Sequence, residues 1–112
     1  MEHQNQGKSS TGMEANIAAL LSYLLGFISG SIFYAIERKN KFVRFHAMQS
    51  TMVFAFLFIL NVLAKLLPSI GWPISTLLGI IGIVIWIFLM IKAYTGEYFK
   101  LPVIGDIAER SS

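Results

Sequence analysis

The chain has 112 residues, of which 55% are hydrophobic and 13% are charged, with a formal net charge of +3 and no cysteine. Because a soluble domain carries roughly 25% charged residues, this composition excludes an ordinary soluble domain and predicts an integral membrane protein. The lack of cysteine excludes disulfides and thiolate nucleophiles, and the two histidines, His3 and His46, are too few to form a metal cluster. We therefore expect no cofactor and no metal.

The N-terminal part divides into a polar tail and an apolar run. Residues 1–13 are polar and are expected to be disordered. Residues 15–36 contain no charge and, at about 1.5 Å per residue, suffice to cross a hydrocarbon core of about 30 Å, which predicts a first membrane span. Small residues share one stripe of this span and predict either a dimer contact or packing within the chain: Ser22, Gly26 and Gly30.

Residues 37–49 form a basic connector between two apolar runs, and four of the nine basic residues lie there. Lys and Arg next to a span resist translocation, so the connector is expected on the cytoplasmic side. Because these charges are concentrated in one loop of a lipid-embedded chain, they favour a role in orientation over nucleic-acid binding. The residues expected to determine the topology are Arg38, Lys39, Lys41 and Arg44.

Two further spans are expected at about residues 44–65 and 73–92, joined by a turn that contains two prolines. Residues 14–95 then form one membrane domain, with the N-terminus outside and the C-terminus in the cytoplasm. Residues 96–112 are expected to form a cytoplasmic interfacial tail. The predicted fold is an all-α bundle of three transmembrane helices with a C-terminal amphipathic segment. Its expected packing and docking residues are Ser75, Gly79 and Gly82 in the third span and Glu97, Lys100, Pro102 and Asp106 in the tail.

A polar group at the start of the second span is the main functional candidate: Arg44, His46, Gln49 and Ser50. Since an unpaired polar group in lipid costs several kcal/mol, these side chains should face protein or water. One interpretation is a polar vestibule, with Glu97 or Asp106 brought up from the tail, in which His46 could respond to pH. The other is lipid anchoring by Arg44 and hydrogen bonding between helices by His46 and Gln49. His46 and Ser50 also have the spacing of a dyad, but no oxyanion loop accompanies them.

Two motifs carry a resemblance to a known family. The sequences Lys-Phe-Val-Arg-Phe-His-Ala-Met-Gln-Ser at 41–50 and Gly-Glu-Tyr-Phe-Lys-Leu-Pro-Val-Ile-Gly-Asp-Ile-Ala-Glu at 96–109 resemble a widespread family of small multispanning prokaryotic membrane proteins. That family is itself similar to the Tic-twenty component of the chloroplast inner-envelope protein import machinery, through Arg44, Phe45 and Gln49, although the plastid proteins have four spans. The resemblance implies a helical membrane bundle and supplies no catalytic residues.

The sequence therefore predicts a non-enzymatic, multi-pass protein of the cell membrane that acts as a subunit or scaffold of a membrane assembly, with protein transport as a candidate process. The expected partners are the lipid bilayer and other membrane proteins or further copies of the chain. The alternative is a homo-oligomeric channel or small-solute carrier, in which Asn61, His46 and Gln49 would face a hydrated path.

Overall fold

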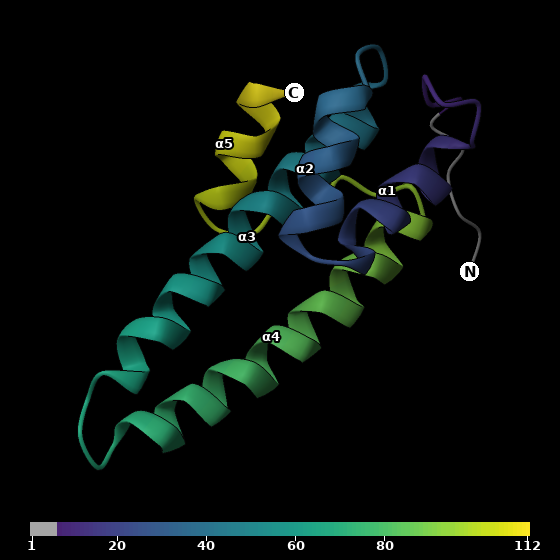
Figure 1. The fold of residues 1–112 in the computed structure, drawn as a ribbon. Coiled ribbons are helices and arrows are strands. Elements are labelled where there is room, and N and C mark those ends of the chain that lie inside the picture. The colour runs from purple at the N-terminus through teal and green to yellow at the C-terminus, as the bar shows by residue number, and fades with distance from the viewer. Residues whose placement is uncertain (1–6) are drawn as a thin grey trace.

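The computed structural model describes residues 7–112, and no β-strand occurs among them apart from a single isolated bridge between Lys8 and Glu14. The fold is therefore all-α, as the sequence predicts. The helices are α1 (Ala15–Leu24), α2 (Phe27–Ile36), α3 (Lys41–Lys65), α4 (Gly71–Tyr94) and α5 (Ile104–Ser111) (Figure 1).

The two longest helices, α3 and α4, form an antiparallel pair that we call the long hairpin. They contain 25 and 24 residues, so each is about 36 Å long. Both are long and apolar enough to cross a membrane, and they correspond to the spans expected at residues 44–65 and 73–92. The turn between them is tight, because Gly71 lies so close to the backbone of Ala64 that a side chain would not fit there.

The single span expected over residues 15–36 is not confirmed, because the chain turns at Leu25 and Gly26 and divides this run into α1 and α2. Gly26 has φ 63° and ψ −130°, a conformation that favours glycine. The Ser29 hydroxyl donates to the carbonyl of Ser22 at 2.9 Å and accepts from the amide of Leu25 at 3.0 Å, and it thereby pairs backbone groups left free by the break. We call α1 and α2 together the short hairpin.

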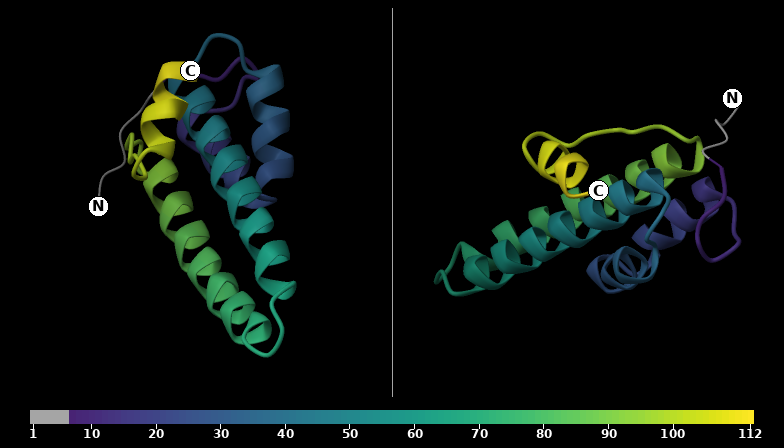
Figure 2. Two further views of the ribbon diagram at one scale, coloured as in Figure 1. Left: turned by 90° about the vertical axis from the view of Figure 1, so that its left-hand side faces the viewer. Right: turned by 90° about the horizontal axis from the view of Figure 1, so that it is seen from above.

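The two hairpins differ in length. Each helix of the short hairpin has 10 residues and is about 15 Å long, half of a hydrocarbon core of about 30 Å. Figure 2 shows the short hairpin beside only one half of the long hairpin. The structure therefore contains two candidate spans and a shorter helical hairpin where three spans were expected.

Both described ends of the chain lie at the end of the long hairpin that carries the connector, which we call the connector end. The amide of Ser10 donates to the Glu37 carboxylate at 2.8 Å, and the Tyr34 hydroxyl donates to the carbonyl of Ser111 at 2.8 Å. The turn between α3 and α4 lies at the opposite, far end (Figure 1). The expected placement of the two termini on opposite sides of the membrane stays a prediction.

The tail expected at residues 1–13 lies partly outside the described residues. Its remaining part, residues 7–13, forms a turn in which the amide of Ser9 donates to the carbonyl of Met13 at 2.8 Å. This turn packs on the connector through Glu37. The described part of the tail therefore belongs to the folded connector end.

The buried core also lies at the connector end. Small side chains on α1 allow it to approach α3 and α4 closely, and aromatic and branched side chains of α3 and α4 fill the remaining space. The buried members include Ala15, Ala18, Ala19, Phe42, Val43 and Leu89. Toward the far end, large apolar side chains are instead exposed, with Leu66 at 74% and Trp72 at 72%. Burial is therefore concentrated where the short hairpin and the tail cover α3 and α4.

Candidate functional site: a buried polar network

The most polar part of the interior is a network of three fully buried side chains, Tyr23, His46 and Gln49. The Tyr23 hydroxyl lies 2.6 Å from His46 Nδ1, and Gln49 Nε2 donates to the same hydroxyl at 3.0 Å. On its other side, His46 Nε2 lies 2.8 Å from the backbone oxygen of Glu97. The network therefore joins α1, α3 and the segment that follows α4.

Gln49 binds the tail through both ends of its amide. Its Nε2 donates to the carbonyl of Phe99 at 2.9 Å, and its Oε1 accepts from the amide of Leu101 at 3.0 Å. Residues 97–101 are not helical, so their backbone groups need partners from elsewhere. The side chains of α3 supply these partners.

The partners determine where each proton lies. The carbonyl of Glu97 can only accept, so His46 Nε2 carries a proton and donates it. In the neutral ring Nδ1 then carries no proton and accepts a hydrogen bond from the Tyr23 hydroxyl. A doubly protonated ring would leave the Tyr23 proton without an acceptor, because Gln49 reaches that hydroxyl with its own donor. The network is complete only with a neutral His46.

Helix geometry and aromatic packing hold His46 in place. His46 and Gln49 are three residues apart on α3 and therefore lie on one face of the helix. The rings of Phe42 and Phe45 stand edge-on to the imidazole, with centroids at 4.6 Å and 4.9 Å. These rings exclude water from the imidazole, which strengthens its hydrogen bonds.

The vestibule interpretation requires a carboxylate beside His46, and the dyad interpretation requires Ser50 to pair with His46. In the structure these residues have other partners. Ser50 donates to the carbonyl of Gly26 at 2.9 Å, so its hydroxyl fastens the tip of the short hairpin to α3. The Glu97 carboxylate pairs with Lys92 at 2.8 Å, and His46 meets only the Glu97 backbone. Asp106 lies 4.0 Å from Lys100. The structure therefore brings neither carboxylate to His46.

Arg44 connects three segments at the connector end. Its guanidinium lies over the Tyr34 ring, 4.1 Å from the centroid, and donates to the carbonyls of Tyr34 at 3.1 Å and Glu37 at 2.6 Å. Its Nε also donates to Ser112 at 3.3 Å. The other three basic residues of the connector are exposed: Arg38, Lys39 and Lys41.

Glu37 is a buried residue whose role the sequence did not reveal. Its carboxylate accepts from the amides of Ser10, Lys39 and Asn40, at 2.8, 3.3 and 3.1 Å, and from the Ser10 hydroxyl. Burial raises the pKa of this carboxyl, but the hydrogen bonds from Ser10, Ser9 and Asn40 outweigh it and lower the pKa to about 2. A signal was present in the sequence, because a lone acid in a basic loop lies three residues before Asn40, which caps α3 through the amide of Val43.

The small-residue stripe expected in the first apolar run, Ser22, Gly26 and Gly30, makes its contacts within the chain. A Cβ on Gly30 would lie 2.8 Å from the carbonyl of Ala47 and from Thr51 Oγ1, so α2 approaches α3 as closely as a glycine permits. Ser22 donates to the carbonyl of Ala19 at 2.6 Å within α1. The Gly26 tip rests against Phe54. This stripe therefore contacts α3 in the structure.

The tail residues hold α5 beside α3. Lys100 pairs with Glu109 of α5 at 2.7 Å, and the carbonyl of Pro102 accepts from the amide of Ile104 at 2.7 Å. Gly105 lies so close to the backbone of Lys100 that a side chain would not fit. Of the tail residues named from the sequence, Glu97 contacts the polar network through its backbone, while Lys100 and Pro102 shape the approach to α5.

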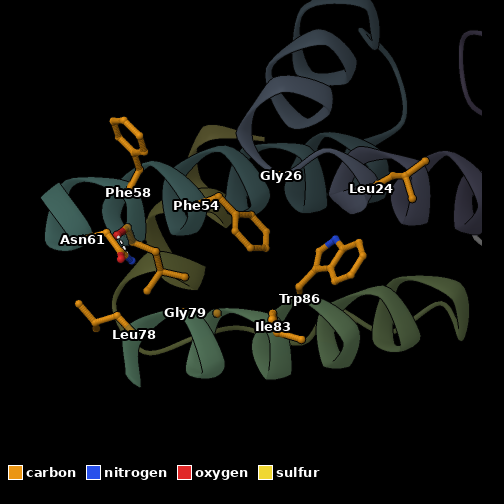
Figure 3. A pocket seen from close by; sticks show the side chains of 11 residues that line it. Leu24, Gly26, Phe54, Phe58, Asn61, Leu78, Gly79, Ile83 and Trp86 are labelled. Atoms are coloured by element: carbon orange, nitrogen blue, oxygen red, sulfur yellow. Dashed lines mark hydrogen bonds between the residues drawn. The ribbon is translucent and has the colours of Figure 1, made fainter. Parts of the chain in front are cut away.

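An open groove lies between α3 and α4 beyond the tip of the short hairpin, with a volume of about 370 Å³ (Figure 3). Ser75 donates to Asn61 Oδ1 at 2.6 Å and ties the two helices together near the far end. A Cβ on Gly79 would meet nothing within 4 Å, and one on Gly82 would meet only Leu57 at 3.5 Å. The groove is otherwise apolar, with Phe54, Phe58, Leu78, Ile83 and Trp86 among its lining residues.

Within residues 7–112, no group of three or more His, Cys, Asp or Glu side chains is placed to hold a metal ion. His3 lies outside these residues.

A model of the magnetosome magnetite crystal formation protein family matches residues 8–108 of the chain. The chain belongs to this family. Among its relatives are UPF0132 membrane proteins of archaea. One from Methanocaldococcus jannaschii is 48% identical over 106 residues, which cover 95% of this chain and 96% of the relative. A second from the same organism is 50% identical over 99 residues, which cover 88% of this chain and 71% of the relative. One from Archaeoglobus fulgidus is 45% identical over 98 residues, which cover 88% of this chain and 95% of the relative.

These matches agree with the resemblance to a family of small prokaryotic membrane proteins. They give no support to the looser similarity to the Tic-twenty component or to a link with protein transport. No solved structure matches the chain significantly.

Proposed function

We propose that this chain is a non-enzymatic scaffold subunit of a membrane assembly, inserted in the cell membrane through α3 and α4 and self-associating through the groove between them. The observation that carries the proposal is a contrast between two sites. Tyr23, His46 and Gln49 use their polar atoms on partners inside the chain, which leaves none of them free for a reaction or a permeant. The groove, by comparison, is open.

The shape of the groove suits a second helix. Without a hydrophobic driving force in lipid, helices associate where small residues let their backbones approach closely. Gly79 provides such a position, since a Cβ added there would meet no atom within 4 Å. We propose α4 of a second copy as the occupant, because the same glycine face on both copies makes a two-fold contact that is complementary to itself and closes the assembly.

The family description names magnetosome magnetite crystal formation. From the family we apply only the membrane setting to this chain, because the archaeal relatives are named as membrane proteins and nothing more. The scaffold proposal rests on the groove and on the closed polar network.

Crosslinking of single cysteines tests the proposed contact. The chain contains no cysteine, so Gly79→Cys introduces a unique thiol in the groove. Ile81→Cys is the matched control, because it lies two residues away on the opposite side of α4, is 41% exposed and does not line the groove. Oxidation in native membranes should give a disulfide-linked dimer from Gly79→Cys and little from Ile81→Cys. Equal crosslinking of the two variants, or a Gly79→Cys variant that stays monomeric, contradicts the proposal.

The process that the assembly serves is tested by purification in gentle detergent. We expect a defined set of membrane proteins to copurify with the wild-type chain and to be reduced when Gly79 is replaced by leucine, which fills the groove. The link to protein transport is supported if export components are among them, and it is abandoned if other proteins copurify in their place.

A further inference from the structure

The tip of the short hairpin lies at the middle of the long hairpin. Gly26 contacts Phe54, which is next to the midpoint of α3 (Lys41–Lys65). On the other side, Gly26 lines the same groove as Gly82, which is at the midpoint of α4 (Gly71–Tyr94). Since α3 and α4 are long enough to cross a bilayer, a tip at their midpoints lies near the bilayer centre. The short hairpin therefore extends through about half of the hydrocarbon core.

The basic residues are distributed unequally between the two ends of the long hairpin. Only Lys65 lies at the far end, where α3 ends. The other eight of the nine basic residues belong to the N-terminal turn, the connector, the last turn of α4 or the tail. These eight are Lys8, Arg38, Lys39, Lys41, Arg44, Lys92, Lys100 and Arg110. An excess of Lys and Arg next to the spans marks the cytoplasmic side.

We propose that α1 and α2 form a re-entrant hairpin that enters the membrane from the cytoplasm, turns at Gly26 near the bilayer centre and returns to the cytoplasm. The N-terminal turn, the connector and the tail then all lie on the cytoplasmic side, and only the turn between α3 and α4 is outside. The partner of the outer face of the short hairpin is the acyl-chain layer of the cytoplasmic leaflet.

The outer face of the short hairpin has the composition that acyl chains require. Leu25, Ile28 and Ile32 are 64%, 53% and 53% exposed, and no charged residue occurs between Ala15 and Ile36. The polar groups at the tip are paired, because Ser29 bonds to Ser22 and Leu25, and Ser50 bonds to Gly26. Irregular backbone at membrane depth is tolerated when protein satisfies its polar groups in this way.

Cysteine labelling in intact cells and in inverted vesicles tests the proposal. Three single-cysteine variants of the full chain suffice, because the wild type has no cysteine. Lys39→Cys marks the connector, and Ser69→Cys marks the turn between α3 and α4. Lys8→Cys reports the side of the membrane on which the N-terminal turn lies. All three positions are exposed. The probe is a membrane-impermeant maleimide, and permeabilised membranes show that each thiol can react.

The decisive result is the side on which Lys8→Cys reacts. We expect Lys8→Cys and Lys39→Cys to react only in inverted vesicles, and Ser69→Cys to react only in intact cells. If Lys8→Cys reacts in intact cells, the N-terminus is outside, the run from residue 15 to residue 36 crosses the membrane, and the proposal is overturned. The readout does not depend on self-association, so it stands or falls separately from the scaffold function.

Discussion

Gln49 and Leu101 are joined by a 3.0 Å hydrogen bond from the Leu101 amide to Gln49 Oε1, although 52 positions separate them in the sequence. The same side chain donates to the carbonyl of Phe99. In an extended chain the carbonyl of one residue and the amide two residues later point the same way, and they normally pair with a neighbouring strand. The Gln49 amide takes the place of that strand and holds the tail on the helices.

Replacing Gln49 by leucine should therefore release the tail. The change leaves the Phe99 carbonyl and the Leu101 amide without their protein partners, and we expect the free energy of unfolding to fall by about 2–4 kcal/mol. Thermal unfolding in detergent measures the loss, and proteolysis after Lys100 should become faster. Met48→Leu on the neighbouring face of α3 is the control, because Met48 makes none of these hydrogen bonds. Similar proteolysis rates in both variants would contradict a holding role for Gln49.

The tautomer of His46 is a second prediction. Its partners require a proton on Nε2 and none on Nδ1. In a His3→Gln variant His46 is the only histidine, so ¹⁵N chemical shifts of the imidazole report this residue alone. We expect a neutral ring protonated at Nε2 at neutral pH. In a Tyr23→Phe variant Nε2 should stay protonated, because it still donates to Glu97, while the Nδ1 signal should shift because its hydroxyl donor is removed. A ring protonated at Nδ1 would show that the network is arranged differently.

Glu37 should make stability depend on acid pH. Its pKa is lowered from the ordinary value of 4.5 to about 2, so the ionised carboxylate stabilises the fold fully above pH 4.5. This contribution is lost as the pH falls from 4.5 towards 2. We expect Glu37→Gln to be less stable than wild type at neutral pH, and the difference to shrink over that interval. Urea unfolding in micelles at several pH values measures it, with Glu14→Gln, at an exposed position, as the control. A difference that is constant with pH would exclude the carboxylate as its source.

Gly26 should be more sensitive to substitution than Gly82, another glycine that lines the groove. Gly26→Ala places a side chain on a backbone with φ 63° and ψ −130°, at a cost of about 1–3 kcal/mol. At Gly82 the added methyl would lie 3.5 Å from Leu57, an ordinary contact in a regular helix. Thermal unfolding in detergent should therefore show a loss for Gly26→Ala and little change for Gly82→Ala. If the two substitutions lowered the stability equally, a side chain at Gly26 would not strain the turn between α1 and α2, and the prediction would be wrong.

The two long helices were predictable from the sequence, because the lysine or prolines that end each charge-free run mark where the helix ends. The runs at 44–65 and 73–92 correspond to α3 and α4. The division of residues 15–36 into two helices was not predicted, since hydropathy depends on composition and does not show where the backbone changes direction. Ser22, Gly26 and Ser29 carried the signal, but their spacing also suits one continuous helix, and only the hydrogen bonds of Ser29 distinguish the two arrangements.

For the candidate site, local pattern could single out His46 and Gln49 because both interrupt an apolar run. Their partners could not be predicted, because Tyr23, Glu97, Phe99 and Leu101 are distant in sequence and three of the contacts involve backbone groups, which every residue has. Glu37 was missed for a related reason, since its main partner is Ser10, in a turn that has no apolar pattern.

The Gly26 turn also gives the molecule a tapered outline. At the connector end α1, α2 and α5 lie around α3 and α4, whereas at the far end only α3 and α4 continue (Figures 1 and 2). With the short hairpin in the cytoplasmic leaflet, as we propose, a body of this shape displaces more lipid area from that monolayer than from the other. The break between α1 and α2 therefore gives the two monolayers unequal shares of this proposed arrangement.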